Sequence, residues 1–86
     1  MHFIIAIRNF TFQPDSIKVP VGATVTWVNC EDVGQEPHTT TADAGIGWDS
    51  PQLSPGNRFS HTFPAQGAFG YHCTPHPFML GKVVVE

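Results

Sequence analysis

The sequence predicts an all-β fold, an antiparallel Greek-key β-sandwich of seven or eight short strands that forms one domain over residues 1–86. Three observations predict it. Eight glycines and eight prolines are scattered along the chain and leave no room for long helices. Apolar residues alternate over short runs, and none follows the 3.6-residue stripe of a helix. A chain of 86 residues has enough apolar surface for one hydrophobic core and too little for two.

Alternating apolar residues predict the first three strands. Phe3, Ile5 and Ile7 share one face of the first strand, because successive side chains of a strand point to opposite faces. A second strand covers 10–12 and ends at a Pro-Asp turn. The third, over 17–21, contains a proline, so we expect it at a sheet edge or a bulge.

The remaining strands follow at regular intervals. Residues 24–29, TVTWVN, form the strongest of them, since they are rich in β-branched side chains. Loops over 30–37 and 43–56 enclose a short strand, and turn residues separate the last three. These four predicted strands cover 38–42, 59–63, 68–73 and 80–85. Such spacing is typical of an antiparallel sandwich with Greek-key connections.

Charge and hydropathy exclude several classes of partner. With 4 Lys and Arg against 7 Asp and Glu, the net charge is −3, which argues against binding to nucleic acid or to an anionic membrane. No apolar run approaches the roughly 18 residues of a membrane span. Five acidic residues fall between Lys18 and Arg58 and form either a solvated loop face or an acidic docking patch: Glu31, Asp32, Glu36, Asp43 and Asp49.

The amino terminus does not have the pattern of a signal peptide. MHFII lacks a basic first region and continues into the first predicted strand. We therefore expect either a cytoplasmic protein or a mature exported protein whose leader has been replaced by Met1.

Metal-binding chemistry is concentrated near the carboxyl end. Cys73, His76 and Met79 lie three residues apart in a loop between two predicted strands, and His38 begins an upstream strand. A thiolate, two imidazoles and a thioether form the ligand set of a copper electron-transfer site, in which methionine is the weak axial ligand. Prolines on both sides of His76 stiffen the loop, so that little conformational freedom is lost when a metal binds.

Two alternatives account for parts of the same pattern. Zinc can use the cysteine and the histidines, although Met79 argues against it, since zinc prefers Cys, His and carboxylate ligands. An immunoglobulin-like sandwich with a Cys30–Cys73 disulfide would explain Tyr71, which precedes a cysteine by two residues. That fold, however, places its tryptophan after the first cysteine, whereas Trp27 lies before Cys30.

The segment YHCTPHPFMLGKVVVE, over 71–86, resembles the carboxyl end of the amicyanins, which are type 1 blue copper proteins of the cupredoxin family. The Cys-x2-His-x2-Met spacing corresponds to their short ligand loop. Residues 12–29 and the pair at 37–38 are similar to the bacterial plastocyanin-like pattern. The resemblance implies a cupredoxin-like fold and one copper ion, held by His38, Cys73, His76 and Met79.

The resemblance also implies a function. It indicates a small, soluble, monomeric electron carrier of the periplasm that cycles between Cu(I) and Cu(II) and is not an enzyme. A donor dehydrogenase or a cytochrome would dock transiently near His76, Pro77 and Phe78. The alternative is a copper-binding module for storage or delivery that has no role in electron transfer.

Two positions depart from the family pattern, and so does the amino terminus, where an additional strand of the amicyanins is absent. Thr39 stands where many relatives have an asparagine that ties the two ligand loops together, and its hydroxyl is expected to form a similar bond. Cys30 lies outside the motif and is expected to be a free thiol.

Overall fold

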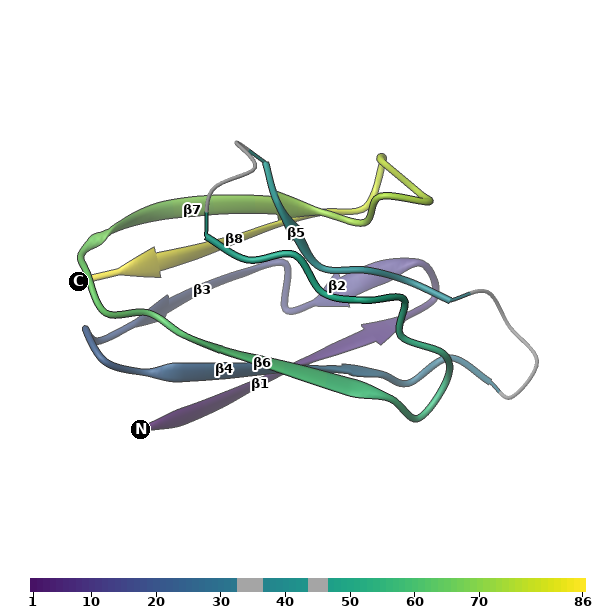
Figure 1. Ribbon diagram of the computed structural model, residues 1–86, viewed down its shortest axis with the longest axis horizontal. Helices are drawn as coiled ribbons and strands as arrows, with labels where there is room; N and C mark the ends of the chain where they lie inside the picture. The colour runs from purple at the N-terminus through teal and green to yellow at the C-terminus, as the bar shows by residue number, and fades with distance from the viewer. Residues whose placement is uncertain (33–36, 44–46) are drawn as a thin grey trace.

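Eight strands make up the secondary structure that the computed structural model describes over residues 1–32, 37–43 and 47–86, and these residues include no helix (Figure 1). Consequently, none of them forms a helix long and apolar enough to cross a membrane. The strands are β1 (His2–Arg8), β2 (Thr11–Gln13), β3 (Ser16–Val19), β4 (Thr24–Asn29), β5 (Thr41–Ala42), β6 (Arg58–Thr62), β7 (Gly67–His72) and β8 (Leu80–Val85).

The strands form two sheets, in the orders β2-β1-β4-β6 and β3-β8-β7-β5. Each strand from β3 to β7 lies in the opposite sheet to the strand before it, so the chain repeatedly crosses between layers. The predicted β-sandwich is thus confirmed. The predicted strand at 38–42 is shorter than expected, because only its last two residues pair with β7.

The expectation that all strands pair antiparallel is wrong for two pairs. β1 runs parallel to β4, and β3 runs parallel to β8, whereas the other four pairs are antiparallel. A parallel pair needs a crossover connection rather than a tight turn. Here the chain visits the opposite sheet between β1 and β4, and several strands separate β3 from β8.

Aromatic side chains fill the space between the sheets. Trp27 and Tyr71 are fully buried, one from each sheet, with ring centroids 5.3 Å apart. Trp48 stacks on Trp27 at 5.5 Å. Burying a large apolar side chain contributes about 1.5–3 kcal/mol, so this cluster is a main source of stability.

The same core fixes the position of the loop between β7 and β8. Tyr71 on β7 pairs with Gly81 on β8, and a Cβ atom at Gly81 would collide with the tyrosine ring. The glycine therefore leaves the space that the tyrosine ring occupies. Their connecting loop lies at the end of the sandwich opposite to both chain termini (Figure 1).

Candidate metal centre

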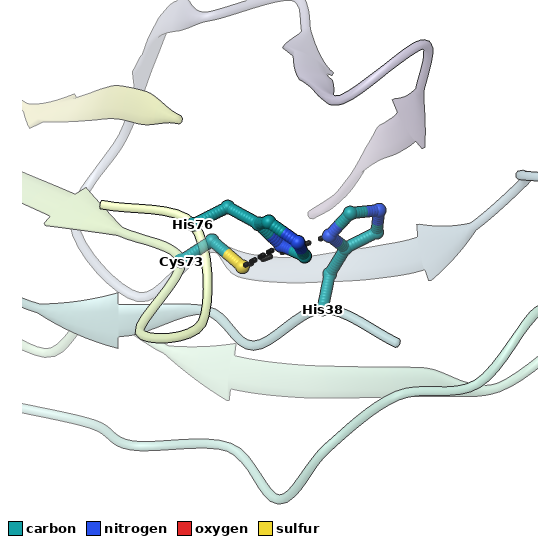
Figure 2. A group of neighbouring side chains, drawn as sticks. All are labelled: His38, Cys73 and His76. Atoms are coloured by element: carbon teal, nitrogen blue, oxygen red, sulfur yellow. Dashed lines mark hydrogen bonds between the residues drawn. The ribbon is translucent and has the colours of Figure 1, made fainter. Parts of the chain in front are cut away.

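Three side chains converge at this end of the sandwich. The Nδ1 atoms of His38 and His76 each lie 3.6 Å from Sγ of Cys73, and Figure 2 shows both rings directed at the sulfur. The three donor atoms lie within 4.8 Å of one another. Donor atoms that are each about 2.0–2.3 Å from a common ion have separations of this size. The arrangement therefore fits a metal ion bound by one sulfur and two nitrogens.

Backbone hydrogen bonds close the loop that carries three of the predicted ligands. Cys73 N–H donates to Met79 O at 3.2 Å, His76 N–H donates to Cys73 O at 3.1 Å, and Met79 N–H donates to His76 O at 2.9 Å. Each predicted ligand in the loop is thus bonded to the other two. The Met79 side chain is buried, with 2% of its surface exposed. The loop holds its side chains in place largely through its own backbone.

His38 comes from a different segment and is held by two further interactions. Its backbone exchanges hydrogen bonds with Leu53, at 3.0 and 2.7 Å, and the residue is completely buried. Its Nε2 lies 3.0 Å from Oε2 of Glu31, whose side chain is only 6% exposed. A carboxylate only accepts hydrogen bonds, so Nε2 is the donor here, and the neutral tautomer that this bond selects has its lone pair on Nδ1, on the sulfur side.

Glu31 also binds the turn between β1 and β2. Its two oxygens accept the amide protons of Asn9 at 3.0 Å and Phe10 at 2.9 Å. Burial alone would raise the pKa of Glu31, but the hydrogen bonds from Phe10, His38 and Asn9 outweigh it and lower the pKa. The carboxylate thus remains ionised while it binds the turn and a predicted ligand together.

Phe10 covers both imidazoles, a role that the sequence did not predict. Its ring centroid lies 5.2 Å from that of His38 and 5.1 Å from that of His76, in edge-to-face geometry. Its φ of 56° and that of Asn9, 54°, place the turn in the left-handed region, which is costly for a bulky residue. The amide hydrogen bonds that Asn9 and Phe10 donate to Glu31 hold the turn in this conformation. The asparagine, which tolerates this region, was the only signal in the sequence.

The sulfur of Cys73 accepts one hydrogen bond from the opposite loop, from the amide of Thr39 at 3.4 Å. The hydroxyl oxygen of Thr39 in turn accepts the amide proton of Thr74 at 2.8 Å. The expected bond between the two ligand loops is thereby confirmed. Cys30 and Cys73 are both free thiols, so the disulfide alternative is wrong.

One edge of the site reaches the surface. His76 is half-buried, whereas Phe78 and Leu80 are 69% and 63% exposed. A groove of about 450 Å³ lies beside them, lined in part by Phe10 and Phe12. The site is thus closed on the His38 side and accessible to another molecule on the His76 side.

The acidic residues of the central segment do not behave as one group. Glu31 is buried against the site and so belongs to neither a solvated loop face nor a surface docking patch, whereas Asp32, Asp43 and Asp49 are exposed. Glu36 lies outside the described residues. The structure therefore separates one internal carboxylate from three surface ones.

A β-sandwich with a cysteine sulfur and two imidazoles at one end, next to a loop methionine, defines the class of copper-binding proteins, since this mixture of soft and nitrogen donors suits copper. The chain belongs to the plastocyanin/azurin family of copper-binding proteins, whose family model matches residues 1–86.

Amicyanins are among the relatives to which the chain is similar. The chain is 39% identical to amicyanin of Paracoccus denitrificans over 96% of its own length and 64% of the relative, so it spans less than two thirds of that protein. It is 38% identical to amicyanin-alpha of Methylorubrum extorquens, over 95% of the chain and 70% of the relative. The resemblance stated from the sequence is confirmed.

Solved structures agree with these relatives. A Cu(I) form of an amicyanin variant superposes with a TM-score of 0.88 and 38% identity, and the match covers 98% of this chain and 81% of that one. A purple cupredoxin from Nitrosopumilus maritimus matches with a TM-score of 0.85 and 32% identity, over 96% and 98% of the two chains. The cupredoxin fold is therefore shown both by sequence and by structure.

Proposed function

We propose that this protein is a small type 1 copper electron carrier and not an enzyme, with one copper ion per chain held by His38, Cys73, His76 and Met79. The convergence of two imidazole nitrogens on one cysteine sulfur carries this proposal. Bound copper supplies a one-electron Cu(I)/Cu(II) couple. In this proposal residues 1–86 form a single copper-binding domain.

The chain's own contribution is to keep the donor atoms in one arrangement. Glu31 fixes the tautomer and orientation of His38, and Thr39 donates an amide proton to the sulfur of Cys73. The backbone bonds of the 73–79 loop leave little room for the other predicted ligands to move. Because the donors are arranged in advance, a change of metal charge needs little rearrangement of the protein, which favours rapid electron transfer.

Electrons enter and leave at the half-buried edge of His76 in this proposal. The surrounding surface is apolar: Pro77 is exposed, as are Phe78 and Leu80. Such a patch suits brief docking of a donor dehydrogenase or a cytochrome to a monomeric carrier, since transient redox complexes bury little area. We place the protein in the periplasm, where exported copper proteins of this kind work.

Electrochemistry separates this function from copper storage or delivery. The purified copper-loaded protein should give a reversible one-electron voltammogram and should retain copper when it is reduced in the presence of a Cu(I) chelator. Loss of the metal to the chelator on reduction would contradict the carrier and support a delivery role. An irreversible voltammogram would argue equally against the carrier.

A further inference from the structure

Three threonine hydroxyls connect the candidate metal centre to a surface carboxylate. Thr39 and Thr74 each follow a predicted ligand directly, and both lie beside the hydroxyl of Thr41. The Thr41 Oγ1 atom is 3.0 Å from Thr39 Oγ1, 3.1 Å from Thr74 Oγ1 and 3.0 Å from Oδ1 of Asp49. Thr41 is thus the meeting point of three hydrogen bonds, although it touches none of the predicted donor atoms through these bonds.

The carboxylate sets the direction of every bond in this network. Asp49 can only accept, so Thr41 donates its single hydroxyl proton to Asp49 and must accept from Thr39 and Thr74. Thr39 donates to Thr41, and its own lone pair therefore accepts the Thr74 amide proton at 2.8 Å. Each donor has one partner, and the chain of bonds has one consistent orientation.

The backbone places Thr41 and Asp49 opposite each other. They form a β-bridge, with flanking hydrogen bonds from Ala42 N–H to Trp48 O at 2.9 Å and from Ser50 N–H to Thr40 O at 3.0 Å. The neighbouring side chains point the other way and are buried, where the indole of Trp48 donates to the hydroxyl of Thr40 at 2.8 Å. The pair is therefore held by the fold and does not depend on two freely moving surface side chains.

We propose that Thr41 is a positioning residue of the copper site, which acts through Thr39 to hold the Thr39 amide against the sulfur of Cys73. That amide lies 3.4 Å from the sulfur, and the strength of its bond depends on how the N–H is directed at the sulfur. An amide proton stabilises electron density on sulfur and so reduces its donation to the metal. Oxidised copper depends more on this donation than reduced copper, so the bond raises the reduction potential.

This inference rests on the proposed copper site, and it adds a residue outside that site as a determinant of the potential. The informative variant is Thr41→Val, which removes the hydroxyl and keeps the branched shape. Thr41→Ser is the matched control, since it retains the hydroxyl. We expect Thr41→Val to stay blue with a lower reduction potential and Thr41→Ser to match the parent. An unchanged or raised potential in Thr41→Val would overturn the proposal.

A double-mutant cycle separates the hydrogen-bond chain from the charge of Asp49 acting through space. Losing a negative charge near the metal would by itself raise the potential. In the parent, Asp49→Ala removes the charge and also interrupts the series of hydrogen bonds. In the Thr41→Val background that series is already interrupted, so Asp49→Ala has only the charge effect. The shift caused by Asp49→Ala should therefore be more negative in the parent. Equal shifts in the two backgrounds would show that Thr41 transmits nothing.

Amide hydrogen exchange tests the series of hydrogen bonds in the copper-free protein. In the copper-free protein, Thr41→Val should accelerate exchange of the Thr74 amide roughly two- to tenfold, which corresponds to the weakening of one hydrogen bond. Thr41→Ser should leave this rate unchanged. Equal Thr74 rates in parent and Thr41→Val would refute the inference even if the copper site is confirmed. If the parent binds no copper, in contrast, the proposed function fails while the exchange result still stands.

Discussion

The substitution Glu31→Gln removes one negative charge from a side chain that is 6% exposed and accepts three hydrogen bonds. Glutamine has nearly the same size, so it can occupy the same space. Its amide, however, offers one oxygen and an NH2 group in place of two accepting oxygens. At least one of the donors from Asn9, Phe10 and His38 must then lose its acceptor.

The loss of stability in Glu31→Gln depends on which of the three donors can form a hydrogen bond with water instead. The amide of Asn9 is in an exposed hydrogen bond and can be hydrated, whereas the Phe10 amide and the His38 imidazole are in partly buried ones. A hydrogen bond to a charged group is worth about 1.5–3 kcal/mol, and an orphaned buried donor costs about 1–3 kcal/mol. We expect Glu31→Gln to lower the free energy of unfolding of the copper-free protein by about 2–3 kcal/mol.

Chemical denaturation of the copper-free protein measures this difference. Asp32→Asn is the matched control, because Asp32 is the exposed neighbour and loses the same charge. It should change the free energy of unfolding by less than about 0.5 kcal/mol. With the orientation of His38 no longer fixed, Glu31→Gln should also bind copper about 10–100-fold more weakly. If Glu31→Gln is as stable as Asp32→Asn, the carboxylate does not bind the turn and the ligand as described.

Three further predictions concern single side chains. Cys73→Ser should abolish the visible charge-transfer band of the copper protein, while Cys30→Ser should keep it; a blue Cys73→Ser protein would end the assignment. Met79→Leu should raise the reduction potential and Met79→Gln should lower it, because an amide oxygen is a harder donor that favours Cu(II). Voltammetry would contradict the axial role if both variants shift in the same direction. Burial lowers the pKa of His61 from 6.5, so as the pH falls the unfolded state takes up the proton first and the folded state loses stability. Denaturation at pH 7 and about pH 5 should show a smaller loss for His61→Phe than for the parent, and equal losses would refute this.

The sequence was sufficient for features that depend on neighbours along the chain. Alternation of apolar residues located the strands, and the spacing of Cys73, His76 and Met79 predicted a loop with three ligands, whose backbone the structure shows to be hydrogen-bonded internally. His38 was added on chemical grounds, because copper sites of this type need a second imidazole. The structure brings its Nδ1 to the sulfur, as that reasoning requires.

Features that depend on distant pairing could not be predicted in the same way. The parallel pairs join strands far apart in the sequence, and alternation carries no information about strand direction. Glu31 stands beside Asp32 in a polar loop, and only the tertiary fold shows that one is internal and the other exposed. Phe10 fits a strand pattern, yet it lies in a turn that places its ring against two imidazoles.

Titration of the purified copper-free protein with Cu(II), followed by visible absorption, tests the central claim most directly. A thiolate-to-copper charge-transfer band requires the sulfur of Cys73 to be bound to the metal, together with the imidazoles of His38 and His76. We predict that an intense blue or purple colour grows linearly and stops at one equivalent of copper per chain. Copper binding without an intense visible band, or a colour that continues to grow beyond one equivalent, would contradict the site described for this protein.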